Sequence, residues 1–234
     1  FDDKIELLQA QNKTLEELAQ TIFKKWFGKY KVGDELPDGW RVGIIEDLTL
    51  KINSGGTPST KEESYYNGYI NWFSTKELQD NFIFESDKKI TEEGLNNSST
   101  KLFPKDTVIM AIYAAPTVGR LGILNQESAF NQAAVGLIAK NKVGYPFVFL
   151  LLKYFRDEFN NLSNGAAQQN LNVGIVKNFK ICIPNEESLN FFNKIQMPLF
   201  EKIRANSIQI QTLTKTRDAL LPKLMSGEIR VKKQ

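Results

Sequence analysis

Histidine is absent from the 234 residues of this chain, and cysteine occurs once. Imidazole is the commonest general base and zinc ligand near neutral pH, so its absence excludes zinc sites and Ser-His or Cys-His nucleophile pairs. The single thiol, Cys182, excludes an internal disulfide and is typical of a reducing, cytoplasmic protein. A metal site built from carboxylates alone remains open on composition.

Long apolar runs and a strong excess of charge are also missing. The longest apolar run, residues 145–152, is far shorter than the roughly 20 residues of a membrane span, so no membrane association is expected. The chain starts at Phe1 without a signal peptide, which indicates a fragment or a processed product. Residues 38–184 carry 15 basic and 15 acidic side chains. If this neutral region contacts DNA, its basic residues must cluster, or a partner must supply most of the attraction.

Both ends of the sequence show apolar residues at alternating steps of three and four, which predicts long helices packed along a narrow seam. The first seam comprises Ile5, Leu8, Asn12, Leu15, Ala19, Ile22 and Trp26. The second comprises Leu189, Phe192, Gln196, Leu199, Ile203, Asn206, Ile210, Leu213, Arg217, Leu220 and Leu224. Asn12 and Asn206 are expected to weaken the seam and to set its register. Ordinary amphipathic helices on a globular core are the alternative.

Prolines and glycines suggest the limits of these elements. Pro198 is expected to start or kink the second helix, and Pro222 with Gly227 to mark its end. Turn residues at 36–40 open a separate globular unit. Within it, strands are predicted at residues 107–113, 121–124, 134–139 and 179–183, and a helix at residues 147–159.

The predicted fold class is α+β, with one globular unit between long N- and C-terminal helices that form an antiparallel coiled coil. The expected divisions are a helix at 1–30, a globular domain at 36–184, a helix at 186–226 and a tail at 227–234.

No motif for catalysis was found in the sequence. It has no P-loop, no Asn-Pro-Pro-Tyr-like tetrapeptide and no strand-linked Gly-x-Gly-x-x-Gly. Asp80, Asp87 and Lys89 are the only candidates for a carboxylate metal site of the nuclease type, and a solvated charged loop is the alternative. We therefore expect no catalytic residue, no metal and no cofactor.

A set of motifs in order along the chain carries a family resemblance. They are residues 11–20 with Lys25-Trp26-Phe27, Leu36-Pro37-Asp38-Gly39-Trp40, Ser54-Gly55-Gly56-Thr57-Pro58-Ser59 with Tyr65-Tyr66 and Ile70-Asn71-Trp72, Leu102-Phe103-Pro104-Lys105, Gly119-Arg120-Leu121-Gly122, Phe130-Asn131-Gln132-Ala133, Gly165 with Gln168-Gln169-Asn170-Leu171, and residues 216–224. Together they resemble the specificity subunits of Type I restriction–modification enzymes. Ala114-Ala115 and Asn71 depart from the family pattern, which often has Gly and Pro there.

The resemblance implies a division of labour between subunits. Such a subunit usually carries two target-recognition domains, each reading half of a split double-stranded DNA site, joined by conserved antiparallel helices. Modification subunits dock on these helices and methylate adenine, and restriction subunits add cleavage. One recognition domain between two helices corresponds to the C-terminal half of a subunit, or to a half-length subunit that pairs with itself through the conserved helices.

Candidate DNA contacts follow from side-chain chemistry and from these motifs. Arg120, between Gly119 and Gly122, is a candidate to read guanine, with a structural arginine as the alternative. Ser59, Lys61 and Lys76 are candidate phosphate contacts, or else parts of an exposed loop. The remaining candidates are Tyr113, which could instead belong to the core, and Gln168, Gln169 and Asn170, which could instead form a structural turn.

A different class of function also stays open. The neutral globular unit could grip a protein, and the chain would then be a coiled-coil scaffold without DNA specificity.

Overall fold

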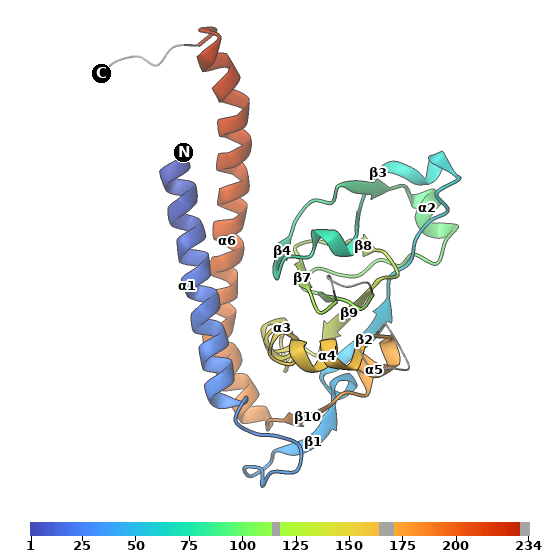
Figure 1. Ribbon diagram of the computed structural model, residues 1–234, viewed down its shortest axis with the longest axis vertical. Helices are drawn as coiled ribbons and strands as arrows, with labels where there is room; N and C mark the ends of the chain where they lie inside the picture. Colours follow the sequence, from blue (N-terminus) through green and yellow to red (C-terminus); the bar gives the residue numbers. More distant parts are fainter. Residues whose placement is uncertain (114–117, 164–170, 230–234) are drawn as a thin grey trace. The chain divides into compact units, whose positions relative to one another are not determined.

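The structure, a computed structural model, describes residues 1–113, 118–163 and 171–229 (Figure 1). Its internal contacts divide the chain into two compact units. The helical unit consists of residues 1–21 and 195–234, and the globular unit of residues 22–194. Among the described residues, no helix combines the length and the apolar composition needed to cross a bilayer.

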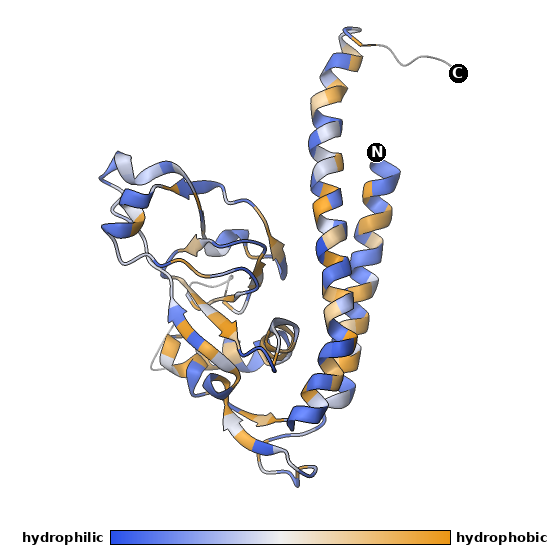
Figure 2. Ribbon diagram, turned by 180° about the vertical axis from the view of Figure 1, so that it is seen from behind, coloured by the Kyte–Doolittle hydropathy of each residue, from blue (hydrophilic) through white to orange (hydrophobic). Residues whose placement is uncertain are grey.

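Two long helices, α1 (Asp2–Trp26) and α6 (Glu186–Met225), carry the predicted seams. Hydrophobic and hydrophilic residues alternate along both of them (Figure 2). The helix α6 begins at Glu186, where the helix at 186–226 was expected, and continues through Pro198, so of the two alternatives at this proline a helix start is wrong. Pro198 is exposed, so its ring meets solvent, and packing on the opposite face offsets the hydrogen bond that proline cannot make. Gly227 follows the last turn with a left-handed φ of 73°, a common helix ending.

Contacts within the helical unit establish that α1 and α6 run antiparallel. Asp2 near the start of α1 pairs with Arg217 near the end of α6, at 2.8 Å between the oxygen and nitrogen atoms. Ten residues further along α1, the side-chain amide of Asn206 donates to Oδ1 of Asn12 at 2.9 Å. Partner numbers fall along α6 as they rise along α1. The predicted antiparallel pair is therefore confirmed.

Apolar side chains between these helices supply the stability that a lone helix lacks. Leu8 and Ala19 from α1 and Ile203 from α6 are buried, as the seam predicts. Elsewhere the seam is displaced by one residue, because Phe23, Phe27 and Phe200 are buried where Ile22, Trp26 and Leu199 were expected, and Leu224 at its far end is exposed. Burying a large aliphatic or aromatic side chain contributes about 1.5–3 kcal/mol, whereas isolated helices are marginal in water. The pairing therefore stabilises both helices.

The globular unit is built around a five-stranded sheet. Its strands are, in spatial order, β2 (Thr49–Ser54), β9 (Ala134–Ala139), β6 (Val108–Ala111), β7 (Leu121–Leu124) and β4 (Asn81–Ile83). Neighbouring strands are antiparallel except for β4 and β7, which are parallel. The predicted strands at 121–124 and 134–139 coincide with β7 and β9, and the strand predicted at 107–113 is shorter in the structure.

Two smaller sheets and several short helices complete the unit. The strands are β1 (Arg41–Ile44) antiparallel to β10 (Lys180–Ile183), and β3 (Tyr66–Phe73) between β5 (Lys88–Ile90) and β8 (Ala129–Phe130). The short helices are η1 (Ile45–Leu48), η2 (Glu63–Tyr65), η3 (Thr75–Glu77), α2 (Glu92–Asn96) and α5 (Val173–Lys177). Only the strand predicted at 179–183 anticipated any of these elements.

The core of the globular unit lies between the five-stranded sheet and a helix. Every residue of β6 and β7 is buried, and α3 (Tyr145–Tyr154) packs against β6, β7 and β9. The single helix predicted at 147–159 is wrong. A break at Phe155 separates α3 from α4 (Arg156–Ser163), and residues 145–152 are all buried rather than apolar on one face. A helix covered on every side shows no amphipathic period in its sequence.

Aromatic rings at the C-terminal end of α1 and the N-terminal end of α6 pack within the globular unit. The ring of Phe23 in α1 lies 5.4 Å from that of Phe147 in α3 and 6.0 Å from that of Phe192 in α6. Phe27 lies 4.9 Å from Phe192 in an edge-to-face arrangement. These distances fall in the range in which aromatic pairs add about 0.5–1.5 kcal/mol beyond their burial. The last residues of α1 and the first of α6 therefore belong to the core of this unit.

Candidate nucleic-acid interface

The Gly-Gly-Thr-Pro loop after β2 lies directly on the turn after β8. The backbone N–H of Gly56 donates to the carbonyl of Phe130 at 2.9 Å, and that of Gly55 to the carbonyl of Ala134 at 3.1 Å. A Cβ atom at position 55 would stand 2.1 Å from the carbonyl oxygen of Phe130. Only glycine allows this approach without a shift of the backbone. The two motifs, 75 residues apart in sequence, are therefore packed against one another.

Three hydrogen bonds that involve side chains hold the same loop in place. The indole N–H of Trp72 in β3 donates to the carbonyl of Gly56 at 2.9 Å. The hydroxyl of Tyr66 donates to the carbonyl of Pro58 at 2.8 Å. The hydroxyl of Thr57 donates to Oε1 of Gln132 in the turn. Two of these contacts come from the later residues of the same motif, and the third comes from the motif at residues 130–133, so the loop is held both from within its motif and from another.

The end of β6 and the motif that ends at Leu171 also reach this turn. The N–H of Ile112 donates to the carbonyl of Ala133 at 2.8 Å, and the N–H of Leu171 donates to the carbonyl of Ile112 at 3.1 Å. Tyr113 follows Ile112 directly and is 38% exposed. Residues 55–59, 112–113, 130–133 and 171 thus meet at one edge of the five-stranded sheet, which we call the motif edge.

Arg120 lies at the same end of the sheet, directly before β7, the strand that pairs with β6. Its carbonyl accepts the N–H of Ala111 at 2.9 Å, and its side chain is partly exposed. Tyr113 and Arg120 therefore lie at the same end of neighbouring strands, with Arg120 paired to the residue two positions before Tyr113. A partly exposed guanidinium there has the donors that a guanine edge or a phosphate would accept.

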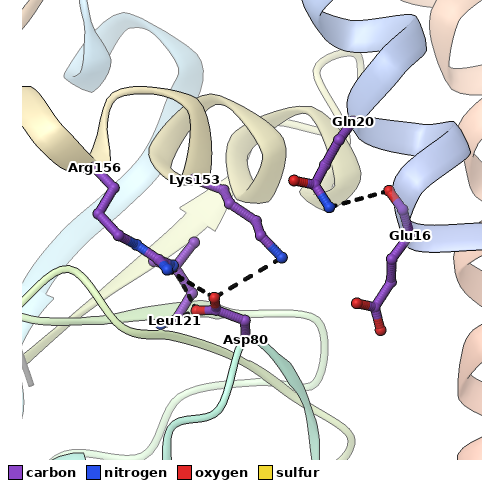
Figure 3. Close-up of polar contacts among 6 residues, drawn as sticks. All are labelled: Glu16, Gln20, Asp80, Leu121, Lys153 and Arg156. Atoms are coloured by element: carbon purple, nitrogen blue, oxygen red, sulfur yellow. Dashed lines mark hydrogen bonds and ion pairs between the residues drawn. The ribbon is translucent and has the colours of Figure 1, made fainter. Parts of the chain in front are cut away.

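A polar cluster of Asp80, Lys153 and Arg156, here called the Asp80 clasp, contacts Leu121, the residue after Arg120 (Figure 3). The guanidinium of Arg156 in α4 donates two hydrogen bonds to the Asp80 carboxylate, one of them 2.8 Å long. Oδ1 of Asp80 also accepts the N–H of Leu121 at 3.0 Å, and Nζ of Lys153 lies 3.8 Å from Oδ2. Figure 3 also draws the bond from Gln20 to the carbonyl of Glu16, which belongs to α1 alone.

The charges of this cluster lower the pKa of the Asp80 carboxyl. Burial by itself raises the pKa of the Asp80 carboxyl, but the hydrogen bonds and charge of Arg156 outweigh that effect. With help from the N–H of Leu121 and the charge of Lys153, they hold the pKa below its ordinary value of 3.8. Asp80 is therefore a carboxylate at neutral pH, and its charge is already neutralised by two cations.

The weaker hypothesis of a carboxylate metal site finds no support in this geometry. Asp80 is engaged by Arg156 and Lys153, and Lys89 lies in β5 of another sheet. Within the described part of the chain, no three His, Cys, Asp or Glu residues are grouped as metal ligands. Residues 80, 87 and 89 are thus close in sequence and are not assembled as a site.

The three predicted phosphate contacts, Ser59, Lys61 and Lys76, are exposed and lie near the motif edge. Ser59 ends the Gly-Gly-Thr-Pro loop, and its hydroxyl accepts the N–H of Lys61 at 3.4 Å. Lys76 lies in η3, three residues after Phe73, whose carbonyl accepts the N–H of Asn131 at 2.9 Å. Their exposure permits contact with a phosphate but does not by itself assign one.

The other predicted residues divide into two groups. Gln168, Gln169 and Asn170, together with Ala114-Ala115, lie outside the described residues. Asn12 and Asn206 contact each other in the helical unit, where Asn12 also donates to the hydroxyl of Ser207 at 3.2 Å. Their effect on register stays a prediction.

Sequence reasoning missed the roles of Arg156 and Gln132. Arg156 was placed inside one predicted helix, and Gln132 was noticed only as part of a motif. For Asp80, the turn-forming run Gln79-Asp80-Asn81 was an available signal, because aspartate tolerates the left-handed φ of 59° observed there. No local pattern links it to Arg156, 76 residues away.

Comparison with known proteins gives these motifs a family. Residues 37–215 match the Type I restriction modification DNA specificity domain. The chain belongs to this family. Among its relatives, the Type I restriction enzyme MjaIX specificity subunit of Methanocaldococcus jannaschii is 32% identical over 99% of this chain and 56% of the relative. The Type I restriction enzyme HindI specificity subunit of Haemophilus influenzae is 26% identical over 98% of this chain and 65% of the relative.

Solved structures of Type I subunits share the fold. The S subunit of a Type I restriction–modification system from M. genitalium superposes with a TM-score of 0.68, at 16% identity over 96% of this chain and 57% of the other. The HsdS subunit from Thermoanaerobacter tengcongensis gives a TM-score of 0.58, at 18% identity over 97% and 55% of the two chains. The resemblance inferred from the motifs is confirmed, and the chain spans a little over half the length of these specificity-subunit structures.

Proposed function

We propose that this chain recognises one half of a two-part DNA target as part of a Type I restriction–modification specificity subunit. The observation that carries the proposal is the motif edge, where three family motifs that are distant in sequence meet the end of β6 around exposed polar side chains. A rigid platform of this kind suits base readout, because discrimination needs donors and acceptors held in one geometry.

Within this proposal, residues 36–184 are the target-recognition domain, and its side chains have two tasks. Arg120 reads a base edge, with Tyr113 beside it against the DNA. Ser59, Lys61 and Lys76 contact phosphates, which position the duplex without specifying its sequence. Gln168, Gln169 and Asn170 are further candidate contacts in the segment that ends at Leu171.

The helices at residues 1–30 and 186–226 serve as a spacer and a docking surface. The 40 residues of α6 correspond to roughly 60 Å of helix, or about 18 base-pair steps of duplex. Modification subunits would bind this helical pair and supply adenine methylation, and restriction subunits would add cleavage. The balanced charge of residues 38–184 supports this arrangement, since partners would supply much of the phosphate attraction.

Selection from a randomised duplex library tests the proposal. The purified chain is incubated with the library alone and with a candidate modification subunit, and the bound duplexes are sequenced. We expect a short enriched motif, single or in two parts with a fixed gap. A stable protein complex that enriches no motif would contradict DNA recognition and favour a protein-binding scaffold.

Self-association through the conserved helices is a separate part of the proposal. Light scattering of the purified chain over a range of concentrations is expected to show a dimer. A monomer at high concentration would count against a half-length subunit that pairs with itself, and it would leave the library experiment unaffected.

A further inference from the structure

The peptide that joins Arg120 to Leu121 is held from both sides. The carbonyl of Arg120 accepts the N–H of Ala111 in β6 at 2.9 Å. The N–H of Leu121 donates to the Asp80 carboxylate at 3.0 Å, and the carbonyl of Leu121 accepts the N–H of Asp80 at 2.8 Å. Asp80 thus contacts the backbone on either side of Leu121, directly after the residue proposed to read a base.

Arg156 supports the same backbone from its other side. Gly119 has a left-handed φ of 79°, and a Cβ atom there would lie 2.9 Å from Cγ of Arg156. The N–H of Gly119 donates to the carbonyl of Ala111 at 2.9 Å. The stem of Arg156 therefore packs on the residue before Arg120, while its guanidinium fixes the carboxylate that holds the residue after it.

The side chains of this clasp are shielded from solvent enough to act as a brace. Those of Asp80, Lys153 and Arg156 are 22%, 19% and 26% exposed. Ion pairs at this depth are screened less than surface pairs, and removing one partner leaves the other without its counter-charge. The clasp links the loop before β4, the start of β7 and helices α3 and α4 through side chains, in addition to the pairing of β4 with β7 and the packing of α3 on β7.

We propose that Asp80 and Arg156 are positioning residues for DNA readout, which act by fixing the backbone from Gly119 to Leu121 so that the Arg120 side chain meets its base in one geometry. This inference rests on the proposed function, because it requires that Arg120 contacts DNA. Asp80 itself points at Leu121 and Arg156, so it acts through them and not by touching the duplex.

The chain offers a chemically matched control elsewhere in the globular unit. Asp47 accepts the N–H of Ile44 at 3.2 Å and a hydrogen bond from Arg41 at 2.9 Å. It therefore repeats the combination of a carboxylate, a backbone N–H and an arginine, but it lies at η1 next to β1 and takes no part in the motif edge. A loss of DNA discrimination that is equal in the Asp80 and Asp47 variants would indicate damage to the fold and not to base recognition.

The experiment compares Asp80→Asn with Asp47→Asn in the full chain bound to its modification subunit. Asparagine tolerates the left-handed φ at position 80 and keeps the side-chain shape, so the change removes mainly the charge. The duplex enriched by the unmodified chain is compared with duplexes altered at each base pair in turn. We expect Asp80→Asn to lose about tenfold in discrimination at one base pair, and Asp47→Asn to discriminate like the unmodified chain.

A double substitution distinguishes a role of Asp80 in positioning Arg120 from a general weakening of DNA binding. If Asp80 acts through Arg120, Asp80→Asn adds no further loss of discrimination to Arg120→Ala, since the oriented group is already gone. Additive losses at different base pairs would overturn the inference. The salt dependence of binding is expected to stay unchanged in Asp80→Asn, because no phosphate contact is removed.

The remaining outcomes each have one meaning. Full discrimination by a folded Asp80→Asn chain, or equal losses in the two aspartate variants, would refute the positioning role. If Asp80→Asn does not fold by circular dichroism, Arg156→Lys decides. Lysine keeps the charge but cannot donate the paired hydrogen bonds, so unchanged discrimination in that variant also refutes it. Failure of the unmodified chain to select any duplex would instead refute the proposed function.

Discussion

The helical unit and the globular unit achieve burial in different ways. In the helical unit, Leu8 and Ile203 are buried along a seam that also contains Asn12, Asn206 and Gln196. In the globular unit, β6 and β7 are buried at every residue. Helices that meet along one stripe tolerate polar residues and can shift slightly, whereas a sheet covered by a helix is enclosed on all sides. The same substitution should therefore cost more in the globular unit than in the helical unit.

The largest expected effect comes from Leu137→Ala in β9. Leu137 is fully buried and pairs across strands with Ile52 and Val108. We expect it to lower the free energy of unfolding by about 4 kcal/mol, because the surrounding sheet cannot close the cavity. Trp26, Trp40 and Trp72 all lie in the globular unit, so tryptophan fluorescence during denaturant unfolding reports on it. Leu50→Ala, at a residue 66% exposed, is the control.

A smaller effect is expected from Leu8→Ala in α1. Leu8 is 2% exposed, so it is nearly as buried as Leu137. We expect a loss of about 2 kcal/mol, at the lower end for this substitution, because the two helices can move together and reduce the cavity. Far-ultraviolet circular dichroism follows the helices, with Leu7→Ala at an exposed position as the control. A loss equal to that of Leu137→Ala would contradict the comparison.

The pH dependence of stability compares two aspartates of different burial within the globular unit, Asp80 and Asp47. The pKa of the Asp80 carboxyl is lower in the folded state than in the unfolded chain, so ionised Asp80 stabilises the folded state at pH values above 3.8. This contribution is lost as the pH falls through the lowered pKa of the folded state. Asp80→Asn should therefore flatten the acid limb of a plot of unfolding midpoint against pH. Asp47 also has a lowered pKa, caused by hydrogen bonds from Arg41 and Ile44, but its side chain is more exposed, at 35%. A larger flattening for Asp47→Asn would contradict the assigned role of burial.

The smallest expected effect is at the asparagine pair in the helical seam. Asn12→Ala removes the hydrogen bond from Asn206 and should cost about 1 kcal/mol. Replacing Asn12 and Asn206 together by leucine should raise the unfolding midpoint but allow more than one helix register or oligomeric state. Denaturant unfolding and light scattering measure the two effects. A single species with unchanged mass in the double variant would show that the asparagines do not set the register.

Sequence reasoning succeeded where the determining pattern is local. The two seams, β7 and β9 could be recognised because apolar spacing over a few turns or a few residues marks them. It failed at Phe155, where packing with distant residues decides whether a helix continues. For the candidate site, Arg120 and Tyr113 were predicted from neighbouring glycines and from motifs, but their shared edge depends on strand pairing across the unit.

The sequence by itself determined that this chain has two seamed helices around an α+β unit, and that it contains no histidine. These properties follow from residue types and from short periods. The tertiary structure alone decided that Gly56 lies on Phe130, that Thr57 meets Gln132, and that Asp80 and Arg156 hold the backbone beside Arg120. Such contacts join residues that only the pairing of strands and helices brings together, and no local pattern in the chain encodes them.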